Sequence, residues 1–437
     1  MKNDIVVKLD DFDLSVRREA LDTLCDGVGG EYPSAGSAMN CHAHTFYSYN
    51  AYGYSPLHFA WLAKQKGLSV AGIVDFDVLD GLDEFVAASQ LLKLKGCVSL
   101  ESRTFVPEFA DRVINSPGEP GVAYHMGIGF TTTDLPQASS EFLAEMRNSS
   151  DERNRGLLER VNAFMKPVEL DYEKDVQSLT PAGNATERHI CLAYARKAAA
   201  TFQDPKDLAQ FWSDKLDVDS VELDLPVGGN LQALIRSKTM KRGGVGYVQP
   251  SSDSFPDMSA MNSFILESGA IPALTWLDGT SAGEQDLDEL LELSMKTGVA
   301  AINIIPDRNF TVGVKDDKLA NLYTIVELAE KLGLPVLVGT EMNSPGLKFV
   351  DDFECVELAP LLPVFEKGAY IVYAHSVLQS NAGMGYLSDW AASMFDNVVA
   401  KNEFFEEFGR RFSPGQEEVL VGVTDKTMSD EILTRLK

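Results

Sequence analysis

The chain has 437 residues, of which 65 are acidic and 38 are basic, giving a formal net charge of −27. Its apolar content of 45% is that of a globular protein, and its length suffices for one large barrel or for two domains. The excess of carboxylates argues against binding to a nucleic-acid backbone, which requires clustered lysine and arginine. No apolar run reaches the length of a bilayer span, so we expect neither a signal peptide nor a transmembrane helix.

The five cysteines favour a reducing compartment. They are odd in number, widely spaced and form no Cys-x-x-Cys pair. Reduced thiols in a cytoplasmic protein are therefore predicted.

Residues 1–37 are predicted to form an N-terminal extension with one amphipathic stretch, Leu14–Leu24. From about residue 38, strand and helix patterns alternate, which predicts a parallel sheet. Ser55 followed by Pro56 is a typical helix start, because Ser caps the helix and Pro fits its first position. This helix is expected to end near Lys66, before Gly67.

Residues from about 135 to 240 have a different pattern. Apolar residues recur at helical spacing and no strong strand intervenes, which predicts a helical insertion between barrel strands. From about residue 244 the alternation returns, with a helix at Leu319–Leu332 that ends at Gly333. Further buried strands are predicted at Val245–Val248, Ala270–Trp276, Val299–Ile305, Leu334–Thr340 and Tyr370–Ala374. The whole of residues 38–437 is therefore interpreted as one barrel with its insertion.

Residues of the types that bind metal ions follow successive apolar runs. His42 and His44 are two apart on a predicted strand and so point to the same face. The next three apolar runs end on Asp75, on Glu101 and on His125. Because strand ends meet at one mouth of a parallel barrel, these groups are expected to converge. Imidazole and carboxylate together suit a divalent transition metal.

Several short motifs occur in order along this part of the chain. They are His42-Ala43-His44-Thr45, Ser48, Ser55-Pro56, Ala63, Gly67-Leu68, Ile73-Val74-Asp75, Gly81, Glu101, Tyr124-His125-Met126-Gly127 and Glu187-Arg188-His189-Ile190. In order and spacing they resemble the polymerase and histidinol phosphatase (PHP) superfamily over about half of the chain. The resemblance implies a distorted (β/α)7 TIM-like barrel, up to three metal ions and, in many members, phosphoester hydrolysis.

The chain departs from the family's pattern at three ligand positions. Phe76 replaces the usual His after Asp, and Trp276-Leu277 replaces a usual His-Pro. Glu341-Met342-Asn343 stands where the family usually has Asp-x-His. Phe and Trp offer no ligand atom, whereas Glu and Asn keep oxygen donors. We therefore expect one or two ions rather than three.

Further candidate residues lie outside this series. His189 belongs to the element that resembles the family's Arg-x-His-Ile, and His375 ends a predicted strand, where it could replace a lost ligand. Glu341 also follows a predicted strand. Arg188 and Arg103 carry guanidinium forks suited to a phosphate or carboxylate.

Asp75 has two readings. It is either a metal ligand or a carboxylate that orients His44 through the second ring nitrogen of that imidazole. His58, in the first turn of a predicted helix, is interpreted as structural.

The first functional hypothesis is a metal-dependent hydrolase of the PHP type that acts on a small phosphorylated or other anionic substrate. Mn, Fe or Zn held by His42, His44 and Glu101 would activate water, and Arg188 or Arg103 would offset negative charge. One alternative is a degenerate barrel that binds a ligand or partner without catalysis. Another is a metal enzyme of a different class, namely a C–N hydrolase, lyase or isomerase. No serine-hydrolase elbow or dinucleotide-binding glycine motif is present.

Overall fold

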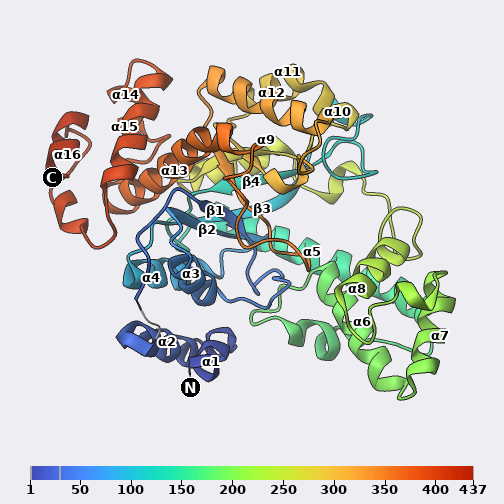
Figure 1. The fold of residues 1–437 in the computed structure, drawn as a ribbon. Helices are drawn as coiled ribbons and strands as arrows, with labels where there is room; N and C mark the ends of the chain where they lie inside the picture. Colours follow the sequence, from blue (N-terminus) through green and yellow to red (C-terminus); the bar gives the residue numbers. More distant parts are fainter. Residues whose placement is uncertain (1, 29–30, 437) are drawn as a thin grey trace.

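The computed structural model describes residues 2–28 and 31–436, so residues 1, 29, 30 and 437 of the predicted extension and barrel lie outside the described part. Seven strands form one sheet in sequence order. They are β1 Met39–Ala43, β2 Val70–Phe76, β3 Gly96–Phe105, β4 Val122–Ile128, β5 Ile271–Trp276, β6 Ala301–Ile304 and β7 Val336–Val338. The chain beyond β7 returns to β1, where Ala43 and Glu341 form a parallel bridge. The sheet therefore curves into a distorted TIM-like α/β barrel (Figure 1).

Strand β4 runs against the rest of the barrel. It pairs antiparallel with both β3 and β5, whereas all the other neighbouring strands pair in parallel. The prediction of a parallel sheet is therefore wrong at this strand. The reason lies in the connection from β3, which contains only the short turn η3 Pro107–Phe109 and no crossover helix that could carry the chain back.

Helices cover the outer face of the barrel. Those between the strands are α3 Pro56–Gln65, α4 Leu82–Leu92, α9 Met258–Glu267, α10 Ala282–Gln285, α11 Leu287–Lys296 and α12 Asp317–Leu332, with the turn η9 Pro306–Arg308. The start predicted for α3 is confirmed, because the Ser55 side chain accepts a hydrogen bond from the backbone of His58. The predicted end of α12 is confirmed too, with Gly333 in the left-handed region at φ 71°.

Two strand predictions are wrong. Residues 245–248 form no strand, and Val245 and Val248 are 46% and 61% exposed. Tyr370–Ala374 lies inside helix α13 Leu362–Ala382. That helix packs between β7 on one side and α15 Val398–Arg411 on the other, so it is apolar on several faces. A short apolar run in such a helix has the same pattern as a buried strand.

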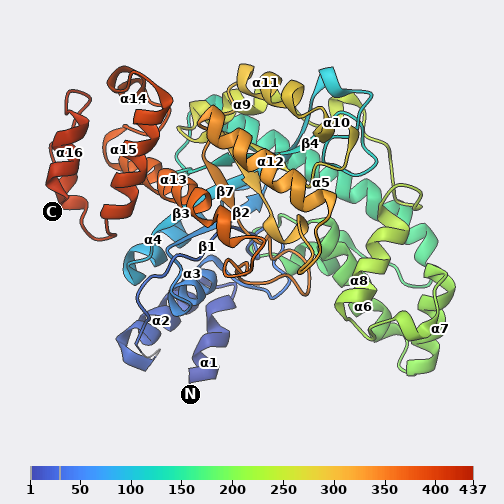
Figure 2. The same ribbon diagram turned by 45° about the horizontal axis from the view of Figure 1, so that its top comes forward.

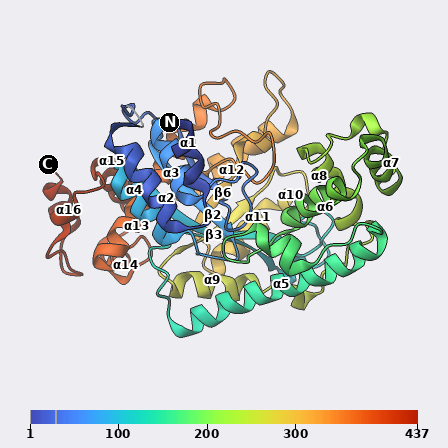
Figure 3. The same ribbon diagram turned by 90° about the horizontal axis from the view of Figure 1, so that it is seen from below.

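A helical lobe, defined here as residues 137–254, separates β4 from β5. Its helices are α5 Gln137–Met165, α6 Glu187–Thr201, α7 Pro205–Leu216 and α8 Gly229–Ile235, with the turns η4 Tyr172–Val176, η5 Gln177–Leu179, η6 Ser220–Glu222, η7 Arg236–Met240 and η8 Ser252–Ser254. The lobe has an apolar core of its own, which includes Val161, Tyr194 and Trp212. Figure 3 shows α5 running along one side of the molecule from the barrel to the other lobe helices.

The two ends of the chain pack on the barrel. The N-terminal elements are α1 Lys2–Val6, η1 Val7–Asp10, α2 Leu14–Thr23 and η2 Leu24–Val28, and α2 is tied to α4 by a buried ion pair of Arg17 with Glu84. The C-terminal elements besides α13 and α15 are η10 Ala359–Leu361, α14 Asp389–Met394, η11 Glu417–Leu420 and α16 Ser429–Arg435. Helices α14–α16 and the helical lobe lie on opposite sides of the barrel (Figure 2). Within residues 2–28 and 31–436, no helix has both the length and the apolar character needed to cross a bilayer.

Candidate metal centre

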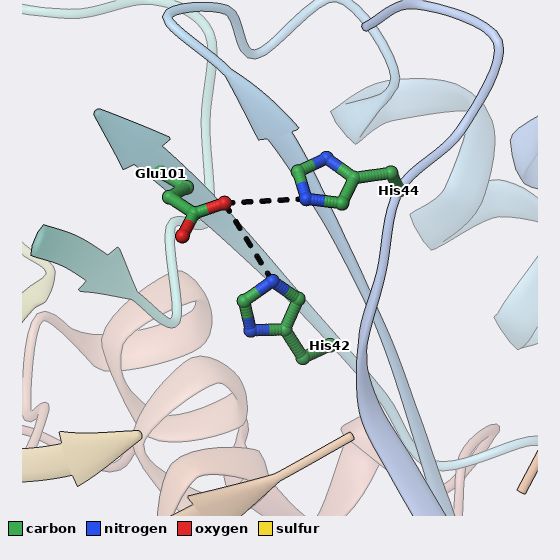
Figure 4. Close-up of side chains that lie close together, drawn as sticks. All are labelled: His42, His44 and Glu101. Atoms are coloured by element: carbon green, nitrogen blue, oxygen red, sulfur yellow. Dashed lines mark ion pairs between the residues drawn. The ribbon is translucent and has the colours of Figure 1, made fainter. Parts of the chain in front are cut away.

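Three buried side chains converge at the mouth of the barrel. His42 lies on β1, His44 follows the end of that strand, and Glu101 lies on β3, two strands away. The Nε2 atoms of His42 and His44 are 3.7 and 3.2 Å from the same Glu101 oxygen, Oε2 (Figure 4). All three side chains are 5% exposed or less. The structure thus brings together the three residues that the sequence indicates as the core of a metal site.

The imidazole of His42 is anchored through its other nitrogen. Nδ1 lies 2.9 Å from Oδ1 of Asn303 on β6, and the amide of Asn303 donates to the backbone carbonyl of Leu337 on β7. Because Oδ1 of Asn303 can only accept, Nδ1 of His42 carries the proton. In the neutral ring, the lone pair of His42 is therefore on Nε2, which faces Glu101.

The imidazole of His44 is anchored in the same way, through a relay of two groups. Its Nδ1 lies 3.0 Å from Oγ of Ser48, and that hydroxyl donates to Oδ1 of Asp75 at 2.6 Å. Asp75 also accepts from the backbone and the hydroxyl of Thr45. Of the two readings of Asp75, this geometry favours the supporting one, in which a carboxylate fixes the tautomer of a metal-binding imidazole.

The cluster fits a divalent transition metal. Neither Nε2 of His42 nor Nε2 of His44 has a hydrogen-bond partner among the described residues, although both atoms are buried. Burial alone would raise the pKa of Glu101, but the contacts from the two imidazoles lower it to about 2, so the carboxylate is ionised. Ligands at about 2.1 Å from a tetrahedral ion lie about 3.4 Å apart, close to the spacings seen here.

Neutral side chains also surround the cluster. Thr275 on β5 pairs in register with Asn303 on β6, whose amide oxygen contacts Nδ1 of His42. Phe76 pairs in register with Glu101 and stacks on His44, with ring centroids 4.5 Å apart. Within the described residues, His42, His44 and Glu101 form the only group of three close His, Cys, Asp or Glu side chains. The geometry therefore supplies a ligand set for one ion.

His125 does not join the cluster. It pairs with Ser102, one residue beyond Glu101, so strand alternation turns it to the opposite face of the sheet. There its Nε2 contacts Oδ1 of Asn262 on α9 at 2.6 Å. The expectation that His125 stands at the carboxyl end of a parallel strand is wrong, because it lies in the middle of the antiparallel strand β4.

Two further predicted histidines also lie outside the cluster. His375 is in helix α13 and not at a strand end, and its nitrogens contact the carbonyl of Gly129 and the backbone N–H of Tyr386. These two contacts leave it no nitrogen for an ion. His189 lies on α6, where its Nδ1 accepts a hydrogen bond from the backbone of Thr186 as part of a capping box.

Glu341 stands beside the cluster, at the seam between β7 and β1. Its backbone N–H donates to the carbonyl of His42, and its carboxylate forms an ion pair with Arg308 at 2.6 Å. Gly339 allows this approach, since a Cβ there would collide with the backbone nitrogen of His42. Arg308 was not among the residues selected from the sequence, although it follows the predicted strand Val299–Ile305 by only three residues.

A cleft of about 970 Å³ opens between the barrel mouth and the helical lobe, and Glu101 forms part of its lining. Eight basic side chains line it, against six carboxylates, in a protein with a net charge of −27. The basic residues are Arg103, Arg153, Arg160, Arg188, Arg236, Lys241, Arg242 and Arg308. The cleft is thus positively charged although the protein as a whole is strongly acidic.

The two predicted anion contacts, Arg103 and Arg188, both line this cleft. Arg103 pairs with Glu119 at 3.3 Å and lies over the ring of Phe255. Arg188 makes no hydrogen bond or ion pair with any residue in the described part of the chain. Its guanidinium is therefore the freer of the two for an anionic ligand.

Comparison with known proteins yields likeness to solved structures. No protein-family model and no curated protein matches the chain. An amidohydrolase from Chromobacterium violaceum, solved with sulfate and without metal, has 15% identity and a TM-score of 0.49, covering 75% of this chain and 96% of its own. A protein from Bifidobacterium adolescentis described as a metal-dependent phosphoesterase has 17% identity and a TM-score of 0.48, covering 76% and 98%. Similarity at these levels does not indicate the function of this chain. The function is therefore inferred from the side chains at the barrel mouth.

Proposed function

We propose that the protein is a metal-dependent hydrolase of small phosphorylated or other anionic substrates, built on a barrel of the PHP type. The observation that carries the proposal is the pair of buried imidazoles. Each is anchored through Nδ1, and each directs toward the same carboxylate, Glu101, an Nε2 that forms no hydrogen bond with the residues that the structure describes. Buried polar atoms without partners are costly, so such an arrangement is expected where a ligand completes it.

The residues at the cluster have two different roles. His42, His44 and Glu101 would hold the ion, while Asn303 and the Ser48–Asp75 relay fix the two rings. A divalent ion bound there supplies Lewis acidity, which polarises a phosphoryl or acyl oxygen and activates water for attack. Because Glu101 also lines the cleft, a substrate in the cleft reaches the position of the cluster.

Two guanidinium groups are placed to bind the anionic part of the substrate. Arg308 is held at the mouth by its ion pair with Glu341, and Arg188 lines the cleft without an ion pair to any described carboxylate. A guanidinium fork donates two parallel hydrogen bonds to a phosphate or carboxylate and so orients it. Both groups would offset negative charge that develops during hydrolysis.

Metal analysis combined with a substrate screen tests this proposal. We expect protein purified without chelator to hold about one ion of Mn, Fe or Zn per chain, the count that a single three-donor cluster supports. Chelation should abolish hydrolysis in a screen of phosphomonoesters, phosphodiesters and amides, and reloading should restore it. A protein that takes up none of these metals on titration would contradict the proposal.

A further inference from the structure

The helical lobe places a second group of cations in the same cleft. Arg236 and Lys241, at the turn η7 and just beyond it, both contact Glu187 on α6. Their distances to the same oxygen, Oε2, are 2.9 and 2.7 Å. One carboxylate thus faces two cations, which leaves a positive charge uncompensated.

The guanidinium of Arg236 is only partly engaged. Its Nε donates to Glu187, while its two terminal nitrogens form no hydrogen bond with any residue that the structure describes. Arg188 lies near it on α6; burial lowers the pKa of Arg188, and the charge of Arg236 lowers it further. The like charges of Arg188 and Arg236 raise the free energy of the empty site, and a bound anion relieves that cost.

The position of this group also points to a ligand. Arg236, Lys241 and Glu187 line the cleft that Glu101 lines, but they belong to the helical lobe, whereas the metal cluster belongs to the barrel. A volume of about 970 Å³ lies at the upper end of the usual range for small-molecule sites and exceeds the need of a single anionic group.

We propose that Arg236 and Lys241 form a second anion subsite, which binds an anionic group on the part of the substrate that does not react. The substrate class is then an organic molecule with a hydrolysable anionic group at one end and a second phosphate or carboxylate at the other. The inference rests on the proposed function for the reacting end. A guanidinium fork next to an ammonium group suits phosphate best. Binding the remote group would help to hold the reacting group at the metal cluster.

Non-hydrolysable probes of graded length test the subsite. Alkane bisphosphonates with increasing numbers of methylene groups are compared by calorimetry with alkyl monophosphonates of the same chain length, on metal-loaded protein. For the spacer that spans the cleft, we expect the bisphosphonate to bind at least about 10-fold more tightly, because its second end binds intramolecularly. The double variant Arg236→Gln with Lys241→Gln should lose this advantage and keep the monophosphonate affinity.

A matched control is available on the same turn. Lys238 is exposed and does not line the cleft, so Lys238→Gln removes one positive charge without touching the subsite. This variant should keep the full preference for the bisphosphonate. Bisphosphonates of every length that bind no better than monophosphonates, or a double variant that keeps the preference, would overturn the proposal.

The variant Glu187→Gln distinguishes loss of the subsite from a general loss of folding. It removes the carboxylate that competes with the ligand, so bisphosphonate affinity should rise, and the ligand should raise the melting temperature more than in wild type. If the three residues only stabilise the lobe, the affinity will stay the same or fall. On metal-free protein, the difference in monophosphonate affinity between wild type and the double variant reports on the subsite, so failure of metal binding and failure of the subsite give different results.

Discussion

The barrel mouth and the segment that follows β7 both bury ionisable groups without hydrogen-bond partners, but only the mouth directs several of them to one point. At the mouth, Nε2 of His42 and Nε2 of His44 face Glu101. Asp351 is 4% exposed, and neither of its carboxylate oxygens has a hydrogen-bond partner in the described chain. Burial, and next the charge of Asp307, raise the pKa of Asp351 to about 8. An unpartnered buried group therefore indicates a ligand site where other donors converge with it, and a cost in stability where it stands alone.

The remaining buried histidines follow the same rule. Nδ1 of His125 also lacks a hydrogen-bond partner among described residues, but in that part of the chain His125 belongs to no group of three close His, Cys, Asp or Glu side chains. His375 contacts backbone groups through both nitrogens. It is thus the convergence of donors, and not the presence of a buried imidazole, that distinguishes the mouth.

Glu101→Gln should have the largest effect, because it removes the only charge among the three donors. We expect metal affinity to fall by about 100-fold or more, with loss of hydrolysis, while the apolar barrel core keeps the protein folded. Metal stoichiometry and thermal melting measure the two effects. Melting of chelated wild type shows separately how much the ion contributes to folding.

His58→Ala is the control for that variant. His58 contacts Asp10 at 2.7 Å in the first turn of α3, away from the cluster, so its loss should lower the melting temperature and leave metal content unchanged. If Glu101→Gln retained its metal while His58→Ala lost it, the assignment of the metal site to His42, His44 and Glu101 would be wrong.

Asp75→Asn should have an intermediate effect. Asp75 is not one of the three donors of the cluster but accepts the hydrogen bond of Ser48, which holds the ring of His44. Loss of such a supporting carboxylate lowers metal affinity by about 10- to 100-fold. Competition with a metal-binding dye measures it. Asp83→Asn, an exposed carboxylate on α4, should leave the affinity as in wild type; equal losses in both variants would rule out the relay.

Asp351→Asn should have the smallest effect, visible only as a change in the pH dependence of stability. With a pKa of about 8 in the folded protein against the ordinary 3.8, the folded state keeps a proton that the unfolded chain releases. Wild-type stability therefore falls as the pH rises between those values, and the variant lacks this loss. We expect equal stability near pH 4 and a gain of about 1 kcal/mol or more for the variant near pH 8. Denaturation curves measure the stability of both proteins at the two pH values. If wild type and variant differ by the same amount at pH 4 and at pH 8, the ionised carboxylate of Asp351 is stabilised by its surroundings and the expectation is wrong.

The sequence by itself determined the features that depend on local periodicity. Apolar runs alternating with helical patterns indicated most of the strands, and the capping residues Ser55 and Gly333 marked helix ends. The two-residue spacing of His42 and His44 placed both imidazoles on one face, and Glu101 followed from its position in the next strand but one. These features could be predicted because spacing along the chain fixes the direction of a side chain within its own element.

The tertiary structure decided everything that depends on which distant segments meet. The direction of β4 turned His125 away from the mouth, and packing on both sides made a helix of Tyr370–Ala374. Asn303 orients His42 from 261 positions further along the chain, and the cations of the cleft come from separate elements of the barrel and the lobe. No local pattern encodes such partners, because strand register and the closure of the barrel set the distances between them.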